Sequence, residues 1–225
     1  MKENINIISE MRYSGGFSTA KESTVIVEGS FNDKWQFKIV NTRGMHPCAY
    51  IRIPDDSCLA NICKELYNKA DRPFYDAPMF NQVHVHGGFT FGEIFTKRSK
   101  EPLWGPGVWI GWDYGHCGDW AGYDTEEENI ASGNTKWGIH DIIPEVASAV
   151  HLLADELDRP RVVRYVARDK NGSLHLFSVE PTKTEEYGTW WDRDYPSEGL
   201  DQAAFPDVKW EDEAPTLVVV TLDTI

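Results

Sequence analysis

Alternating apolar and polar residues predict two strands joined by a tight turn between residues 25 and 40. In VIVEGSFNDKWQFKIV, apolar side chains recur at every second position on both sides of Asn32-Asp33, which is the period at which a strand presents one face to a core. Asn and Asp tolerate the left-handed backbone that a two-residue hairpin turn requires. The segment therefore predicts a β-hairpin, and CAYIRIP (48–54) predicts a further strand that ends at Pro54.

Two other segments have helical spacing. Between Ser57 and Ala70 the apolar residues lie three or four positions apart, and Asp55, Asp56 or Ser57 can cap the helix that they predict. A longer apolar face runs from Asp141 to Leu157 and comprises Ile142, Ile143, Val146, Ala147, Val150, Leu153 and Leu157. We expect Asp141 to cap this second helix and Pro144 to fall in its first turn, where a missing N–H costs little.

The rest of the chain favours β structure. Residues 1–22 predict no regular element, whereas QVHVHGGFTF (82–91), VWIGWD (108–113) and TLVVVTL (216–222) predict strands. RVVRYVARD and SLHLFSV flank Lys170-Asn171-Gly172, where Asn-Gly favours a type I′ turn. The predicted fold class is α+β, with a mostly antiparallel sheet and two principal helices in a core domain of residues 1–160, followed by a small C-terminal β appendage of residues 161–225.

The negative net charge limits the classes of partner that the sequence predicts. The chain has 22 Lys and Arg against 36 Asp and Glu, a formal net charge of −14. Proteins that hold duplex nucleic acid carry a basic face, so duplex nucleic acid is not a predicted partner. The sequence has no apolar run of about 18 residues and no signal-peptide pattern, and its four cysteines form no C-x-x-C pair. We therefore expect a cytoplasmic protein that does not enter a membrane and keeps reduced thiols.

Candidate chemistry is concentrated between His84 and Asp119. On a strand, His84 and His86 would point to the same side, next to Gly87-Gly88. The strand 108–113 ends at Asp113 and leads into a loop with His116 and Asp119. Imidazole and carboxylate are ligands of zinc and other divalent metals, and the same groups serve in acid–base catalysis without metal. The four candidate catalytic or metal-ligating residues are His86, Asp113, His116 and Asp119, and a divalent metal is the candidate cofactor.

A second group of residues is predicted to bind the ligand. The group comprises His84, Gly87, Gly88, Thr90 and Trp120. Glycine lets a ligand approach the backbone closely, and an indole next to a pocket can stack on a planar ligand. The competing structural hypothesis is that these His and Asp side chains satisfy backbone groups and close turns, and that the tryptophans fill the core.

Three segments carry a resemblance to a known family. M-H-P-C-A-Y-I-R-I-P (45–54), V-H-G-G-F-T-F (85–91) and W-I-G-W-D-Y-G-H-C-G-D (109–119) resemble the motifs of a widespread family of small uncharacterised bacteriophage and prophage proteins. The positions that match the family pattern are His86, Gly87, Gly88, Thr90, Phe91, Asp113, His116, Gly118 and Asp119. His84 stands where the family often has Asp or Asn. The resemblance implies a phage or prophage protein that acts in the cytoplasm of a bacterial host.

These observations lead to two hypotheses of function. The first is a phage accessory protein that binds a small polar ligand such as a signalling nucleotide of host defence, with metal-assisted hydrolysis of that ligand left open. The second is an interaction protein that mimics nucleic acid or blocks a host factor through its acidic surface. The sequence leaves the oligomeric state open.

Overall fold

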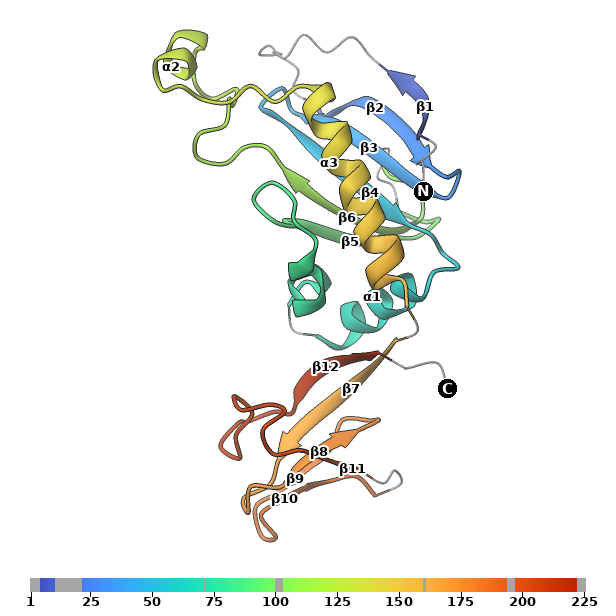
Figure 1. Cartoon of the computed structure of the whole chain (residues 1–225), viewed down its shortest axis with the longest axis vertical. Coiled ribbons are helices and arrows are strands. Elements are labelled where there is room, and N and C mark those ends of the chain that lie inside the picture. Colours follow the sequence, from blue (N-terminus) through green and yellow to red (C-terminus); the bar gives the residue numbers. More distant parts are fainter. Residues whose placement is uncertain are drawn as a thin grey trace. The chain divides into compact units, whose positions relative to one another are not determined.

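The computed structural model describes residues 5–10, 22–70, 72–99, 103–159, 161–193 and 197–221. The chain divides into two compact units, Met1–Arg159 and Pro160–Ile225. Figure 1 shows the helices and strands of both units. Among the described residues, no helix has the length and apolar character that crossing a bilayer requires.

The first unit is built on a six-stranded antiparallel sheet with the order β1-β2-β3-β4-β6-β5. Its strands are β1 (Ile5–Glu10), β2 (Thr24–Phe31), β3 (Trp35–Thr42), β4 (His46–Ile53), β5 (Phe91–Phe95) and β6 (Gly107–Asp113). The predicted hairpin is confirmed as β2 and β3, and both Asn32 and Asp33 have positive φ. The N-terminal segment differs from the expectation, because β1 pairs with β2 where no regular element was predicted.

The two principal helices are confirmed, with one change at a cap. Ser57 caps α1 (Cys58–Lys69) by accepting the N–H of Ala60 at 3.2 Å. The second helix, α3 (Ile139–Leu152), begins two residues earlier than predicted, with Gly138 as its N-cap. Asp141 is not the cap. Its carboxylate accepts the Gly138 N–H from the third helical position, and Pro144 consequently lies beyond the first turn.

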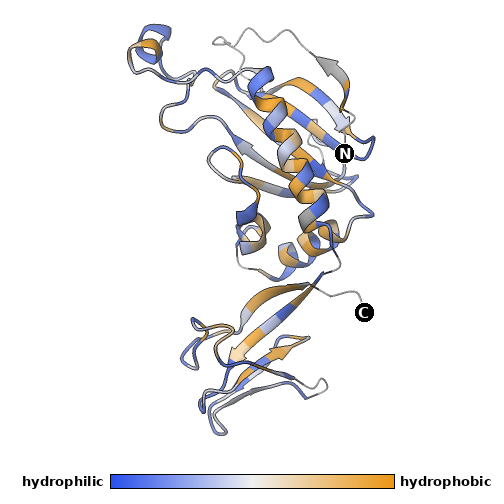
Figure 2. Cartoon of the chain, in the orientation of Figure 1, coloured by the Kyte–Doolittle hydropathy of each residue, from blue (hydrophilic) through white to orange (hydrophobic). Residues whose placement is uncertain are grey.

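The core of this unit lies between α3 and the sheet. Figure 1 shows α3 crossing the face of β2, β3 and β4, and the apolar positions predicted for this helix include Ile142, Val146 and Val150, which are buried. Figure 2 shows apolar and polar residues alternating along α3, as expected for a helix with one buried and one exposed face. The helix continues as a π-helical turn, η3 (Leu153–Leu157), whose two ends are buried leucines.

One predicted strand is absent and one helix was not predicted. Residues 82–90 form no strand. The 3₁₀ turns η1 (Phe74–Asp76) and η2 (Pro78–Gln82) lead into an irregular turn, and β5 begins only at Phe91. The strand prediction fails because Gly87 and Gly88 both have positive φ, which interrupts the extended backbone. In the Gly- and Asp-rich loop, a short helix, α2 (Glu126–Ala131), forms behind a capping box of Thr125 and Glu128.

The second unit consists of short antiparallel strands. A four-stranded sheet has the order β11-β8-β7-β12, and a separate pair joins β10 to β9. The strands are β7 (Arg161–Arg168), β8 (Leu174–Phe177), β9 (Thr182–Thr184), β10 (Thr189–Trp191), β11 (Glu198–Leu200) and β12 (Thr216–Thr221). The turn between β7 and β8 is not type I′, because Gly172 alone among its residues has positive φ. Antiparallel sheets in both units, with two main helices, confirm the predicted α+β class.

Candidate functional site

Strand pairing places the beginning of β4 next to the end of β6, where the loop with the candidate residues starts. β4 and β6 pair with Cys48 opposite Asp113, and the N–H of Tyr114 extends the ladder by donating to the carbonyl of Pro47 at 3.0 Å. His46 therefore lies beside Gly115, where a Cβ would stand 2.8 Å from the Nδ1 of His46. The close approach of strand and imidazole requires glycine at position 115.

The centre of the site is an ion-pair contact between His86 and Asp119. The Nε2 of His86 lies 2.7 Å from Oδ2 of Asp119, and the two side chains are 25% and 4% exposed. The backbone N–H of His116 also donates to Oδ2, at 2.9 Å, and the indole of Trp137 donates to Oδ1 at 2.7 Å. Burial by itself raises the pKa of Asp119, but these donors outweigh it, and the pKa is lowered. Asp119 is therefore ionised at neutral pH.

An ionised carboxylate can only accept hydrogen bonds, which fixes the tautomer of a neutral His86 ring. Nε2 carries the proton that is donated to Asp119, and Nδ1 keeps its lone pair. Within the described residues, nothing in the protein forms a hydrogen bond to this Nδ1. The arrangement is that of a histidine held by a buried carboxylate on one side and available as a base on the other.

Aromatic rings fix the plane of the His86 imidazole. The ring stacks on Tyr114 with centroids 5.1 Å apart and planes inclined by 6°, and it contacts Trp137 at 4.8 Å. The ring of His116 lies 5.3 Å away. Because both flanking aromatics are held by hydrogen bonds of their own, to Glu145 and Asp119, the imidazole cannot turn without breaking them.

Glu145 ties the His86 turn to α3. Its Oε1 accepts the backbone N–H of His86 at 2.7 Å, and its Oε2 accepts the Trp112 indole at 3.2 Å and the Tyr114 hydroxyl. Burial, followed by the bond to Glu145, raises the pKa of Tyr114 far above its usual value, so this phenol stays protonated and donates. One carboxylate thus positions the backbone of His86 and the ring on which it stacks.

Asp113 and His116 form the second half of the site. Oδ2 of Asp113 accepts the Thr90 hydroxyl at 2.9 Å, and Oδ1 accepts the Gly115 N–H at 3.0 Å. The Nε2 of His116 is 3.6 Å from Oδ1 of Asp113, too far for a hydrogen bond. This nitrogen is buried without a hydrogen-bond partner, as is the Nδ1 of His46. Buried polar atoms without partners are rare in proteins, so each of these two nitrogens calls for an explanation.

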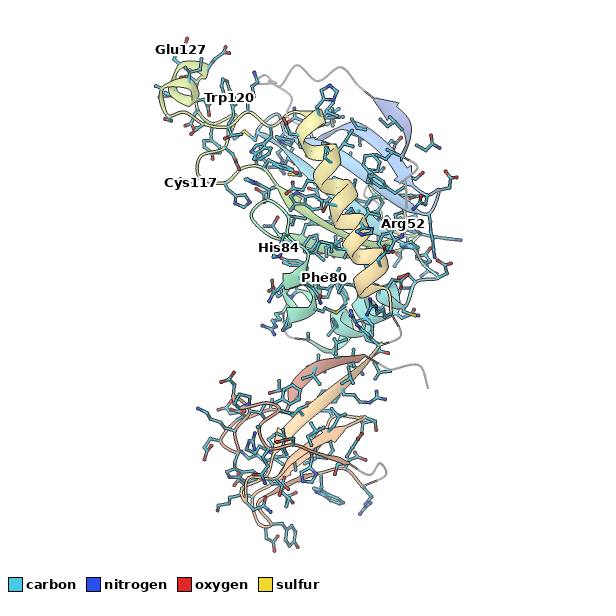
Figure 3. The ribbon with its side chains drawn as sticks, viewed as in Figure 1. Arg52, Phe80, His84, Cys117, Trp120 and Glu127 are labelled. Carbon is cyan, nitrogen blue, oxygen red and sulfur yellow. The ribbon has the colours of Figure 1, made fainter. Side chains whose placement is uncertain are left out.

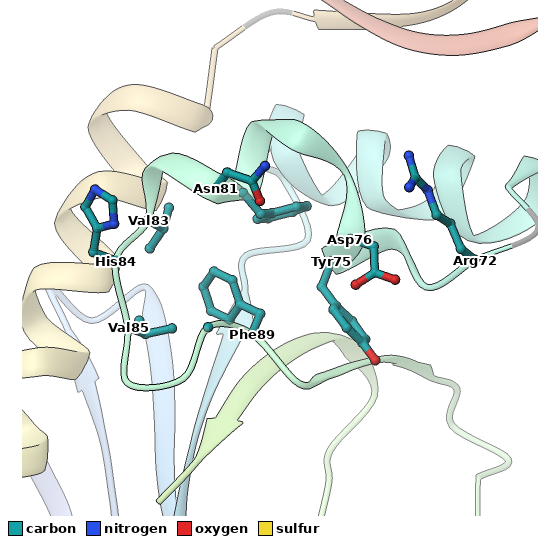
Figure 4. A pocket seen from close by; sticks show the side chains of 10 residues that line it. Arg72, Tyr75, Asp76, Asn81, Val83, His84, Val85 and Phe89 are labelled. Atoms are coloured by element: carbon teal, nitrogen blue, oxygen red, sulfur yellow. The ribbon is translucent and has the colours of Figure 1, made fainter. Parts of the chain in front are cut away.

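The predicted residues are brought together only in part. His86, Asp113, His116 and Asp119 gather at one place, with Thr90 bonded to Asp113 and Gly87 against His116. His84 does not join them: without a strand, His84 and His86 do not share a side, and His84 lines a separate pocket together with Gly88 (Figure 4).

One face of the Trp120 ring is covered, and one of the two amides of Gly87-Gly88 already donates a hydrogen bond within the protein. The ammonium of Lys136 lies 4.6 Å from the centre of the Trp120 ring and covers one of its faces. Figure 3 shows Trp120 near the segment that leads to α2, apart from His84. The N–H of Gly88 donates to the carbonyl of Val85 at 2.9 Å, so it is not available to a ligand.

The predicted metal set is not formed. Among the residues that the structure describes, no group of three or more His, Cys, Asp or Glu side chains is placed to hold a metal ion. The reason lies in the bonding of Asp119, whose oxygens already face three N–H groups, including the Nε2–H of His86. Two of the four predicted ligands are therefore bonded to each other.

Three important residues were missed by the sequence analysis. His46 precedes a predicted strand, Trp137 follows the loop, and Glu145 lies on a helix face between apolar positions. His46 stands in the first of the three motifs that carry the family resemblance, which was the available signal. Nothing in the local sequence distinguishes Glu145 from a solvent-exposed glutamate, since only tertiary structure places Trp112 and Tyr114 against it.

The half-buried His46 predicts a pH dependence of stability. Burial is the main cause of a pKa below the usual 6.5, with opposing contributions from Asp113 and Asp119. Because the folded state resists protonation, His46 contributes stability that is fully present above the unfolded pKa and is lost as pH falls through the folded pKa. We expect His46→Gln to flatten the decline in unfolding free energy below about pH 6.5, measured by urea unfolding followed through tryptophan fluorescence. The other histidines are common to both proteins, and a parallel decline in the two would contradict the assignment.

Comparison with family models, with curated proteins and with solved structures returned no match to this chain.

Proposed function

We propose that this protein acts on a small polar ligand by acid–base chemistry centred on His86. The observation that supports the proposal is the buried Asp119, which orients the His86 ring and is itself held by Trp137 and by the backbone of His116. A histidine titrates near neutral pH, and a carboxylate bonded to one nitrogen stabilises the cation that forms when the other nitrogen takes a proton. His86 is the proposed base and Asp119 its positioning residue.

We propose that the second imidazole, that of His116, acts as the acid that donates a proton to the leaving group. His116 is 35% exposed in its side chain and lies 3.6 Å from a carboxylate oxygen of Asp113. An imidazole that carries a proton on both ring nitrogens can donate one of them to a leaving group. Two histidines with ring centroids 5.3 Å apart can thus serve one substrate as base and acid. Hydrolysis through a water activated by His86 is the reaction that this arrangement supports best.

The proposed ligand class takes its starting point from the resemblance to phage proteins, a family to which no activity is attached. A signalling nucleotide of the bacterial host is the first class to test, and an activity against it would counter host defence. Asp113, Asp119 and Glu145 make the surroundings negative, so a phosphate group would need at least one protonated imidazole as its partner.

The second hypothesis, an interaction protein that mimics nucleic acid, receives less support. The acidic first turn of α2 does not have the arrangement that such a mimic needs. Glu126, Glu127 and Glu128 form the first turn of α2 and are all exposed. Consecutive helical residues point about 100° apart, so they do not form the spaced row that a nucleic-acid mimic needs. Glu128 is also engaged by the Thr125 N–H and hydroxyl in the capping box.

The test is incubation of the full chain with cyclic and linear nucleotides, with and without Mg²⁺, Mn²⁺ or Zn²⁺, followed by chromatography. We expect turnover that persists in the presence of a chelator, and a loss of about 10²- to 10⁴-fold in His86→Ala. Release of intact ligand after denaturation would show a binding protein without catalysis. Chelator-sensitive turnover would reject the metal-independent mechanism, and no binding to any nucleotide would reject the ligand class.

A further inference from the structure

A second pocket lies beside the turn that carries His86, and the proposed chemistry does not use it. The cavity has a volume of about 560 Å³, within the range of small-molecule sites. One wall comes from residues 72–83 around η1 and η2, and the other from residues 84–89 (Figure 4). His86 and Asp119 do not line it, so the pocket is separate from the histidine centre.

One end of the pocket is lined by firmly supported apolar side chains, and polar atoms make up most of the exposed lining. Phe80 is 2% exposed and meets the edge of Phe89 with centroids 5.9 Å apart. Phe89 in turn packs on the buried Trp112 at 5.8 Å. Val83 and Val85 complete this apolar end. Phe80 and Val83 are already buried, so the apolar surface open to a ligand comes from the half-buried Val85 and Phe89.

One cationic and one anionic side chain, both exposed, line the other end of the pocket. Figure 4 shows Arg72, Tyr75 and Asp76 at this end, with Asn81 between it and the apolar residues. Within the described residues, the guanidinium of Arg72 and the carboxylate of Asp76 form no ion pair with each other or with a third side chain. Burial, Asp76 and Glu93 together raise the pKa of Tyr75, so its phenol stays neutral and able to donate.

We propose that this pocket binds a free α-amino acid with a large apolar side chain. The carboxylate of the ligand would pair with Arg72, its ammonium with Asp76, and its side chain would lie against Val85 and Phe89. The balance of one cation and one anion favours a zwitterion. A nucleotide brings at least one phosphate and would meet a single guanidinium next to a carboxylate.

The experiment measures binding to the full chain by calorimetry, with phenylalanine and three matched ligands. N-acetylphenylalanine lacks the ammonium, phenylalaninamide lacks the carboxylate, and adenosine monophosphate represents the nucleotides. We expect phenylalanine to bind, and each blocked ligand to bind about 10- to 100-fold more weakly. Turnover at His86 is not measured, so this result is independent of the proposed function.

Two variants connect each charge of the ligand to its partner. Arg72→Gln should weaken the binding of phenylalanine by about 10- to 100-fold and leave the binding of phenylalaninamide unchanged. Asp76→Asn should weaken the binding of phenylalanine and leave the binding of N-acetylphenylalanine unchanged. Arg98→Ala, an exposed charge outside the pocket, is the control and should have no effect. Overturning results are tighter binding of adenosine monophosphate than of phenylalanine, no binding of phenylalanine, or equal sensitivity of all ligands to both variants.

Discussion

Replacing Gly87 by alanine is expected to lower the free energy of unfolding by about 2–5 kcal/mol. Gly87 has a φ of +66°, and a Cβ added there would lie 1.9 Å from the Nε2 of His116. The left-handed backbone costs an L-residue about 1–2 kcal/mol, and overpacking adds about 1–3 kcal/mol. The displaced imidazole should also lose its place beside Asp113. Chemical denaturation measures the first effect, and the imidazole NMR signals of His116 report the second.

The neighbouring glycine is a matched control. Gly88 has a similar φ of +81°, but a Cβ there would meet nothing within 4 Å. Gly88→Ala should therefore cost only the backbone contribution of about 1–2 kcal/mol and leave the His116 signals in place. Equal losses of stability in the two variants would show that the contact between Gly87 and His116 has no energetic weight, and that the turn alone explains both glycines.

Replacing Asp119 by asparagine is expected to lower turnover of the nucleotide substrate by about 10²- to 10⁴-fold. An amide can keep the bond from the Trp137 indole through its oxygen, but it then turns its NH₂ group toward the Nε2 of His86. Nε2 becomes an acceptor, the proton moves to Nδ1, and His86 can no longer take a proton from water. The loss arises from the wrong tautomer as much as from the lost charge.

The tautomer can be measured without any ligand. Nitrogen NMR of the imidazole should show the proton of His86 on Nε2 in the original protein and on Nδ1 in Asp119→Asn. Asp141→Asn, which alters an exposed carboxylate at the beginning of α3, is the control for the loss of a negative charge. Full activity in Asp119→Asn, or an unchanged tautomer, would remove Asp119 from its positioning role.

The sequence determined those elements whose information is local. The hairpin around Asn32-Asp33 was predictable because strand period and turn residues agree within 16 positions, and both residues adopt the left-handed backbone. The apolar face of α3 was predictable because its spacing repeats over several turns. His86, Asp113, His116 and Asp119 could be selected as a candidate group for a similar reason, since each adjoins glycines or the end of a predicted strand.

The tertiary structure decided how those groups are used. The two positive φ values at Gly87 and Gly88 turn the chain away from a strand, so His84 and His86 face different surroundings although an alternating pattern would place them together. Asp119 is a hydrogen-bond acceptor at the centre of a network, which Trp137 joins from the far end of the loop. Glu145 and His46 join the site through helix packing and strand register. Such contacts join residues 18 to 69 positions apart, and no local pattern records which of them will meet.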